Sequence, residues 1–192
     1  MLADYLNTLI NSKVPCIQLS GREEHRYRYL LENNLPYVVT WDSIQGLCPK
    51  SSEDTAMPVD ALEYILSYND KEAVFLLFDF HHYFDNPSVI RMLKKCIESI
   101  RDRGGRTIVL VTPSEDIPRE LEKEVLSVRA PLPTQKEIYS HLSTAMQKLT
   151  QNGIVVPLFS NKRLLLRTIY ALKGLTLTQI DEQLNALRFN PR

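Results

Sequence analysis

Apolar and polar positions along the chain follow two alternating periods, one typical of strands and one typical of helices. Five short apolar runs have the length and composition of buried strands: 14–19, 36–41, 73–78, 107–111 and 125–128. Segments with apolar residues at helical spacing flank or separate them: 4–11, 22–33, one that begins near Pro58, and a long one from Pro87 to Gly104. This order predicts an α/β sandwich with a mostly parallel sheet.

Two of the predicted strands differ from the others in ways that indicate their place in the sheet. The run Ala73–Phe78 is apolar without a break, as in a strand covered on both faces, so we expect it near the centre. The run 125–128 is shorter, and we expect it at an edge. Asn86 predicts the start of the long helix, and Gly104 predicts its end.

The pattern changes after Pro133, where the strands stop. Thr134–Glu137 and Thr176–Gln179 have the spacing of a capping box, in which a hydroxyl and a carboxylate or amide satisfy free backbone N–H groups at a helix start. Apolar residues at helical spacing follow both. The chain is therefore predicted to consist of an α/β domain, 1–133, and a small all-helical unit, 134–192.

Composition and charge exclude several classes of protein. The chain has 192 residues, 44% of them hydrophobic, which is enough for an ordinary globular core. Its 23 Lys and Arg balance its 23 Asp and Glu, which argues against nucleic acid or anionic lipid as general partners. No apolar run approaches the roughly 18 residues of a membrane span, and the amino terminus does not resemble a secretory signal. We expect a cytoplasmic protein, or a stromal one if it is plastid-encoded, without membrane contact.

Cysteine and histidine do not predict a metal site. The three cysteines are isolated in the sequence, so they indicate neither a zinc site nor a disulfide framework. His81 and His82 are adjacent, with Asp79 nearby. Because adjacent residues of a strand or helix point in different directions, we interpret this cluster as the polar tip of a loop.

The positions after the predicted strands are the most informative, because ligands of an open parallel sheet bind beyond its carboxyl ends. Ser20-Gly21-Arg22 follows the first strand, where a nucleotide-binding protein has the Walker A sequence Gly-x-x-x-x-Gly-Lys-Ser/Thr. The loop is too short for that phosphate cradle and has no lysine, and the carboxylates of Glu23 and Glu24 compete with a phosphate for the helix-start amides. Ser20 and Glu23 instead have capping-box spacing.

The third and fourth strands end in residues with partial nucleotide chemistry. Asp79 stands where a magnesium-binding Walker B aspartate belongs, but the next position, which needs a glutamate base, is Phe80. Thr112 ends the fourth strand and either contacts a γ-phosphate or only begins the turn at Pro113, which we favour. The sequence therefore predicts the architecture of an NTPase without its catalytic parts.

Three stretches together resemble the degenerate amino-terminal AAA+ domain of the plastid and cyanobacterial open-reading-frame AAA ATPase family: 77–81 (LFDFH), 117–124 (IPRELEKE) and 130–134 (APLPT). The stretch 171–177 (ALKGLTL) is similar to the lid of that family. The resemblance implies an AAA+-like three-layer sandwich whose five-stranded parallel sheet has the order 5-1-4-3-2, followed by a small helical lid. In that family an intact AAA module follows the degenerate one.

A fold without cradle or base favours a pseudo-ATPase, that is, a non-catalytic scaffold that contacts another protein or copies of itself. Arg101, Arg103 and Arg106 form a basic cluster at the end of the long helix and are the candidate contact residues. The resemblance implies this role, because arginines in this region of an AAA ring can reach a neighbour's phosphate. The alternative is a solvated helix end, where cations suit the carbonyl dipole.

Two other functions compete with the scaffold. One is a module that senses ATP or ADP without turnover, although we expect neither ATP nor Mg²⁺ as a cofactor. Its pocket would be lined by Ser20, Gly21, Arg22, Asp79 and Thr112. Arg22 would then replace the missing lysine. The other is nucleic-acid binding through 25–29 (HRYRY), where cations alternate with aromatics, although this stretch also fits an ordinary helix with Tyr27 turned inward.

Overall fold

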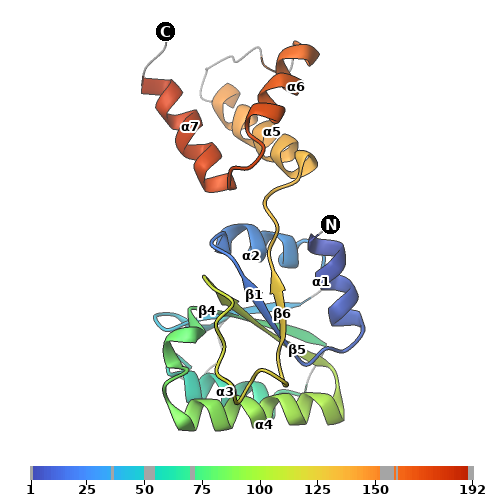
Figure 1. The fold of residues 1–192 in the computed structure, drawn as a ribbon, viewed down its shortest axis with the longest axis vertical. Coiled ribbons are helices and arrows are strands. Elements are labelled where there is room, and N and C mark those ends of the chain that lie inside the picture. The colour runs from blue at the N-terminus through green and yellow to red at the C-terminus, as the bar shows by residue number, and fades with distance from the viewer. Residues whose placement is uncertain are drawn as a thin grey trace. The chain divides into compact units, whose positions relative to one another are not determined.

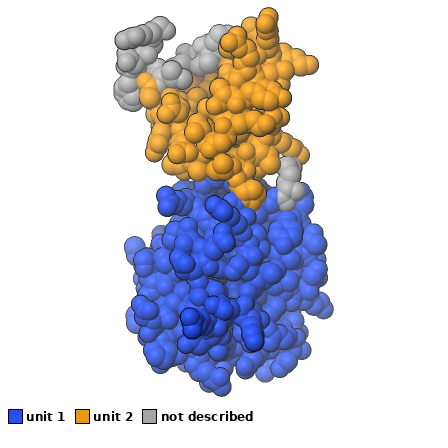
Figure 2. All heavy atoms as spheres, in the orientation of Figure 1, with its two compact units in different colours: residues 1–130 blue, residues 131–192 orange. Residues whose placement is uncertain are grey.

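The computed structural model describes residues 2–35, 37–49, 55–69, 72–151, 158 and 160–189. Its contacts divide the chain into two compact units, Met1–Ala130 and Pro131–Arg192, which Figure 2 shows in different colours. The boundary at 130/131 lies just before the one that the sequence pattern places at 133/134. Each unit has a hydrophobic cluster of its own.

Unit 1 is an α/β structure around a six-stranded sheet in the order β3-β2-β4-β5-β1-β6 (Figure 1). The strands are β1 (Cys16–Ser20), β2 (Val38–Asp42), β3 (Gly46–Cys48), β4 (Ala73–Phe78), β5 (Arg106–Thr112) and β6 (Leu126–Arg129). Every neighbouring pair is parallel except β2 with β3. The two predictions about position are confirmed, since the apolar β4 lies inside the sheet and the short β6 lies at an edge.

The mostly parallel sheet predicted from the sequence is confirmed, but the five parallel strands that the resemblance implied are corrected by a sixth strand, β3. This strand has three residues and returns antiparallel to β2 through a tight turn. A carboxylate oxygen of Asp42 accepts hydrogen bonds from the backbone N–H groups of Ile44 and Gln45, at 2.8 and 2.7 Å, and holds that turn. A strand this short has no detectable periodicity, and its first residue, Gly46, is typical of a loop. Pro36, at the start of the predicted second strand, lies outside the described residues.

Helices cover both faces of the sheet. They are α1 (Leu2–Asn11), α2 (Glu24–Glu32), α3 (Pro58–Ser67), the 3₁₀ helix η1 (Phe80–Tyr83) and α4 (Pro87–Arg103). Strand β4 shows the layering: Phe75 and Leu77 belong to the cluster with α3 and α4, whereas Val74 and Leu76 belong to the cluster with α1 and α2. Each fully buried side chain of this size contributes about 1.5–3 kcal/mol to folding.

The predicted ends of the long helix are confirmed. Asn86 is the N-cap of α4, and its side-chain oxygen accepts a hydrogen bond from the N–H of Ser88 at 2.9 Å. Pro87 is the first helical residue, where a missing N–H costs nothing. Gly104 follows the helix with a φ of 70°, which a residue with a Cβ adopts only with strain.

Unit 2 consists of α5 (Gln135–Gln151), α6 (Lys162–Ala171) and α7 (Leu177–Phe189). Both predicted capping boxes are present. Thr134 N–H donates to the carboxylate of Glu137 at 2.9 Å, and Glu137 N–H donates to the hydroxyl of Thr134 at 3.3 Å. Thr176 and Gln179 exchange the same pair of bonds at 2.9 and 3.2 Å. Among the described residues, every helix is too short or too polar to span a membrane.

Candidate functional site

The structure brings the predicted nucleotide-binding residues to one edge of the sheet, at the carboxyl ends of three adjacent strands. Ser20 at the end of β1 pairs with Thr112 at the end of β5, and the N–H of Gly21 donates to the carbonyl of Thr112 at 2.8 Å. Asp79 follows β4, which pairs with β5 on the other side. Arg22 follows Gly21 and is exposed. These five residues occupy the edge at which an open α/β sheet holds its ligands.

The space beside Gly21 is filled by the side chain of Tyr27, which is 2% exposed. A Cβ on residue 21 would overlap the Tyr27 hydroxyl and lie 2.8 Å from the ring carbon Cζ. Burial raises the pKa of Tyr27, against the opposing effect of hydrogen bonds with the backbone of Glu23 and Arg22. The neutral phenol is therefore held against the β1–α2 turn, in the position where a phosphate cradle needs free backbone N–H groups.

A buried ion pair lies at the start of α2. Arg26 Nη1 donates to a carboxylate oxygen of Glu23 at 2.9 Å, and the two side chains are 3% and 5% exposed. Glu23 is the N-cap residue, but its side chain makes no capping hydrogen bond. The carboxylate, which Arg26 neutralises, stands beside the helix start that would otherwise attract an anion.

The predicted capping box between Ser20 and Glu23 was wrong. Ser20 is still part of β1, and its hydroxyl donates to the carbonyl of Val128 on β6 at 3.4 Å. The Glu23 carboxylate bonds to Arg26. The spacing matches the motif, but β1 extends through Ser20, so the Ser20 hydroxyl does not reach the helix start.

Gln18 is a buried polar residue of this edge that the sequence prediction missed. Its side-chain nitrogen donates to the Thr112 hydroxyl at 3.1 Å and to the carbonyls of Ser114 and Asp116, each at 3.2 Å. Its oxygen accepts from the Ser127 hydroxyl at 2.8 Å. A polar residue inside the apolar β1 was the available signal. Gln18 thus fixes the segment after β5 against the sheet.

Thr112 is also engaged in this network. Its hydroxyl donates to the carbonyl of Ser114 at 2.7 Å, and the residue is 2% exposed. The hydroxyl therefore stabilises the turn that follows β5, in agreement with the favoured interpretation of this residue.

Asp79 and Phe80 have very different environments. Asp79 is exposed and adopts a left-handed conformation, with φ 53° and ψ 18°, at the start of η1. Phe80 is fully buried, with its ring centroid 5.4 Å from that of Trp41 and 6.0 Å from that of Tyr83. The position that a catalytic glutamate would occupy therefore belongs to the hydrophobic core.

His81 and His82 do not point apart, so the argument from adjacent residues was wrong here. Their ring centroids are 4.1 Å apart, and one ligand atom from each histidine and one from Asp79 all lie within 4.8 Å of one another. Asp79 is left-handed and the histidines lie in a 3₁₀ turn, which is neither strand nor α-helix. Burial, with the charge of His82, lowers the pKa of His81, and Asp79 opposes this. The sequence predicts no metal site only if residues 79–82 have the geometry of a strand or an α-helix.

Further carboxylates surround this edge. Burial raises the pKa of Glu24, in the first turn of α2; the charges of Asp79 and Asp42 raise it further, and that of His25 opposes them. Carboxylates from β2, the β4–η1 connection and α2 therefore lie close enough to interact. A concentration of negative charge disfavours nucleotide phosphates and favours cations.

The three arginines of the predicted contact cluster lie where α4 ends and β5 begins. One of them is buried and two are exposed. Arg106 is a buried residue of β5, which corrects its assignment to the contact cluster. Its guanidinium donates to the carbonyls of Ile65 and Leu66, at 2.7 and 3.0 Å, at the end of α3. Arg103 is exposed. Arg101 is exposed and bonds to a carboxylate oxygen of Glu124 at 2.7 Å.

The stretch 25–29 does not present its cations and aromatics on one surface. Arg26 and Tyr27 are buried, and Arg28 pairs with Glu32 at 2.7 Å. Tyr29 is 65% exposed. The stretch is an ordinary amphipathic helix with Tyr27 turned inward, as the alternative interpretation predicts.

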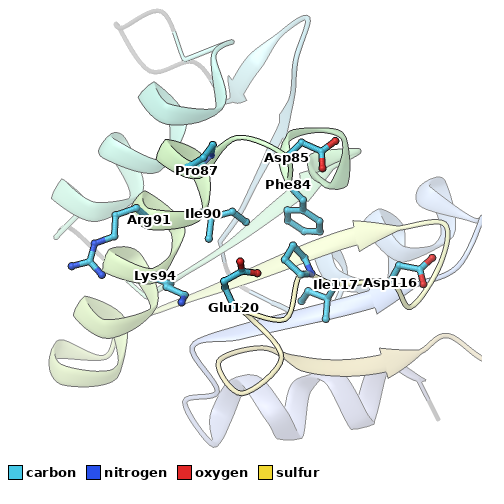
Figure 3. A pocket seen from close by; sticks show the side chains of 10 residues that line it. Phe84, Asp85, Pro87, Ile90, Arg91, Lys94, Asp116, Ile117 and Glu120 are labelled. Atoms are coloured by element: carbon cyan, nitrogen blue, oxygen red, sulfur yellow. The ribbon is translucent and has the colours of Figure 1, made fainter.

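A groove of about 670 Å³ opens between the first half of α4 and the segment that follows β5 (Figure 3). Its apolar lining comes from Phe84, Pro87, Ile90, Ile117 and Pro118. Its charged lining comes from Asp85, Arg91, Lys94, Asp116 and Glu120. The Arg101–Glu124 ion pair joins the same two segments farther along. The groove thus combines an apolar surface with charges of both signs.

Comparisons with known proteins identify the family. A sequence model described as "SpoVK-like AAA ATPase, N-terminal domain" matches residues 2–130. The chain belongs to this AAA family. The resemblance found in the sequence is confirmed by an uncharacterized AAA domain-containing protein, ycf46, of Guillardia theta, 28% identical over 90% of this chain. Its counterpart in Pyropia yezoensis is 27% identical over 77% of this chain.

The AAA relatives are longer than this chain, which covers 34% of the Guillardia protein and 32% of the Pyropia protein. Solved structures support the AAA+ fold. The PCH-2 protein of C. elegans gives a TM-score of 0.57 at 13% identity, over 100% of this chain and 62% of that chain. A DNA replication initiation factor gives 0.59 at 10% identity, over 97% and 59%. In this AAA domain, Glu23, Tyr27 and Asp79 lie at the carboxyl ends of the strands, where an open α/β sheet holds its ligands.

Proposed function

We propose that this AAA domain is a non-catalytic pseudo-ATPase module that serves as a scaffold for protein interaction or assembly. The observation that supports this most directly is the contact between Tyr27 and Gly21. A phosphate cradle requires free N–H groups and open space at this turn. Here a buried phenol fills the space, and the Glu23 carboxylate, paired with Arg26, lies beside the helix start.

The position next to the metal-binding acid does not supply the base that hydrolysis needs. Attack by water requires a base or a water-orienting residue beside the metal-binding acid, and the residue beside Asp79 is the buried Phe80. The Thr112 hydroxyl, which could contact a γ-phosphate, already donates to Ser114. We therefore propose that the domain is not an enzyme and has no ATP or Mg²⁺ as a resident cofactor.

We further propose that the helical unit 134–192 corresponds to the lid of AAA+ proteins. The scaffold surface in unit 1 is the groove between α4 and the segment after β5, because it combines apolar side chains with Lys94, Arg91 and three acidic residues. Such a surface suits an extended segment of another protein or of a second copy. The setting is the cytoplasm or the plastid stroma.

A thermal-shift titration with MgATP and with MgADP tests the absence of nucleotide binding. A ligand at a hundredfold excess over its Kd stabilises a protein by about 2.7 kcal/mol, which raises Tm by several degrees in a chain of this size. We expect no shift. A shift that Arg22→Ala and Asp79→Asn both abolish would refute the proposal and establish the sensing module, because these exposed residues are the ones it requires.

The sensing module has one specific observation in its favour. Arg22 and Asp79 are both exposed at the ligand edge, so a nucleotide could approach them without displacing a buried side chain. The nucleotide would have to bind without a phosphate cradle. The sensing module is therefore the second candidate function.

A pair of neighbouring lysines provides a matched test of the scaffold surface. Lys94 lines the groove, whereas Lys95 is exposed on the same helix and does not. In sedimentation velocity we expect self-association, if a second copy is the partner, to weaken with Lys94→Glu and to persist with Lys95→Glu. If the chain is monomeric, proximity labelling with the same two variants in cells should show the same difference. Equal labelling patterns would exclude the groove.

A further inference from the structure

We propose that Asp79, His81 and His82 form a binding site for a divalent transition-metal ion of the zinc class. The site would supply two imidazole nitrogens and one carboxylate oxygen, a donor set typical of zinc, cobalt and nickel. Magnesium prefers oxygen ligands and retains its waters, so this is not a nucleotide-magnesium site. The proposal is independent of the proposed scaffold function.

The backbone explains how residues so close in sequence reach one point. Asp79 ends β4 in the left-handed region, with φ 53° and ψ 18°. The chain then enters the tight 3₁₀ turn η1, where the N–H of His82 donates to the carbonyl of Asp79 at 3.1 Å. Left-handed residues other than glycine are uncommon, and they concentrate at functional sites. This turn places both imidazoles beside the Asp79 carboxylate.

The separation of the ligand atoms is close to what a metal requires. The three atoms lie within 4.8 Å of one another. Tetrahedral zinc, with bonds of about 2.0–2.2 Å, needs its ligand atoms roughly 3.4 Å apart. Asp79 and His82 are exposed and His81 is half-buried, so side-chain rotation without backbone movement can bring them closer.

His81 provides a second observation. Its Nδ1 is buried, and the described residues offer it no hydrogen-bond partner. A buried nitrogen without a partner is costly, and native structures rarely contain one. The cluster uses one of the two ring nitrogens of His81. A metal ion bound through Nδ1 would be the missing partner of that nitrogen.

The charges around the cluster favour a cation. Glu24 lies close enough to both Asp79 and Asp42 for their charges to act on it. The Asp79 carboxylate beside the two imidazoles is therefore part of a wider group of acidic side chains, which the charge of His25 offsets in part at Glu24. Because three protein ligands leave at least one coordination position open, a bound ion could also accept a side chain or a carboxylate from a partner.

Metal binding is measured on the whole chain after removal of metal with a chelator. We expect equilibrium dialysis to show one Zn²⁺ bound per chain, and Co²⁺ to give the visible absorption of a nitrogen-coordinated site. His82→Ala and Asp79→Asn should each weaken binding by tenfold or more, since removing even an outer-sphere partner of a metal ligand costs about 10–100-fold. Asparagine tolerates the left-handed conformation, so Asp79→Asn removes the charge and leaves the turn intact.

His141→Ala is the matched control, because His141 also pairs with a carboxylate, Asp181 at 2.7 Å, but has no second histidine beside it. We expect it to bind Zn²⁺ as the unchanged chain does. Failure of the stripped chain to bind either Zn²⁺ or Co²⁺ would overturn the proposal. Binding that survives both His82→Ala and Asp79→Asn, with circular dichroism showing a folded protein, would also overturn it.

Discussion

The hydroxyl of Tyr27 lies against the Cα of Gly21, in the volume that a Cβ at residue 21 would occupy. The two residues are separated by the β1–α2 turn, and Ala130, beyond β6, completes the enclosure at 3.2 Å from the same position. Glycine is required here because of this close approach. One side chain of α2 thereby converts the turn from a potential anion site into part of the core.

Gly21→Ala should destabilise the α/β unit through overpacking, by about 1–3 kcal/mol. The methyl group would meet both the oxygen and the Cζ of Tyr27. In a Tyr27→Phe background the oxygen is absent, so the cost of Gly21→Ala should be smaller by more than about 0.5 kcal/mol, the usual limit of additivity. Urea unfolding of the four proteins measures this difference. Additive costs would show that the two residues do not compete for the same space.

Arg106→Ala should destabilise the domain by about 2 kcal/mol or more, because it removes hydrogen bonds from a charged donor to carbonyls at the end of α3. Arg103→Ala is the matched control, since Arg103 is exposed at the end of α4. It should change the free energy of unfolding by less than about 0.5 kcal/mol. Chemical denaturation distinguishes the two. Equal effects of the two substitutions would mean that Arg106 is a surface residue like Arg103.

Much of the fold could be predicted because its signals are local. The unbroken apolar run of β4, the Asn86 cap and the Thr134–Glu137 box each arise from residues adjacent in sequence. The strand β3 could not be predicted, because three residues that begin with Gly46 have no period. Its pairing depends on Asp42 and on contacts with Thr55, whose hydroxyl accepts from the N–H of Leu47 at 2.8 Å.

The candidate site was predicted less well, for a geometric reason. The rule that adjacent side chains diverge applies to strands and α-helices. Asp79 adopts a left-handed conformation and the chain then forms a 3₁₀ turn, so the rule does not apply here. Nothing in the composition of 79–82 indicates that turn. Tyr27 was predicted to face inward, but the contact of its hydroxyl with Gly21 depends on the length of the β1–α2 turn. Gln18, in contrast, was visible as a polar residue inside an apolar strand.

The cysteines should differ sharply in reactivity toward thiol reagents. Cys16 and Cys96 are buried, and burial raises the pKa of Cys16 and raises that of Cys96 to about 12. Only the thiolate reacts quickly, so both should be inert in the native chain. Cys48 is exposed. We expect one thiol to react with Ellman's reagent at pH 8 and all three after unfolding, and none in native Cys48→Ser. Rapid native reaction of a second thiol would contradict the packing.

Glu24→Gln should stabilise the protein at neutral pH and have little effect below about pH 4. Burial, and then the charge of Asp79, raise the pKa of Glu24 above its usual value of 4.5; the charge of His25 opposes this, and that of Asp42 adds to it. Below the unfolded-state pKa the carboxyl is protonated in both states. As pH rises through the folded-state pKa, the folded chain must ionise a group whose charge it disfavours, and stability falls.

Thermal unfolding at about pH 3.5 and pH 7.5 measures this effect. The gain in Tm from Glu24→Gln should appear only at the higher pH. It should shrink in an Asp79→Asn background, because one of the charges that disfavours ionisation is then absent. Glu63→Gln, on the exposed side of α3, is the matched control and should shift Tm little at either pH. A destabilising effect of Glu24→Gln at pH 7.5 would mean that His25 and the helix dipole, and not the neighbouring carboxylates, dominate at this position.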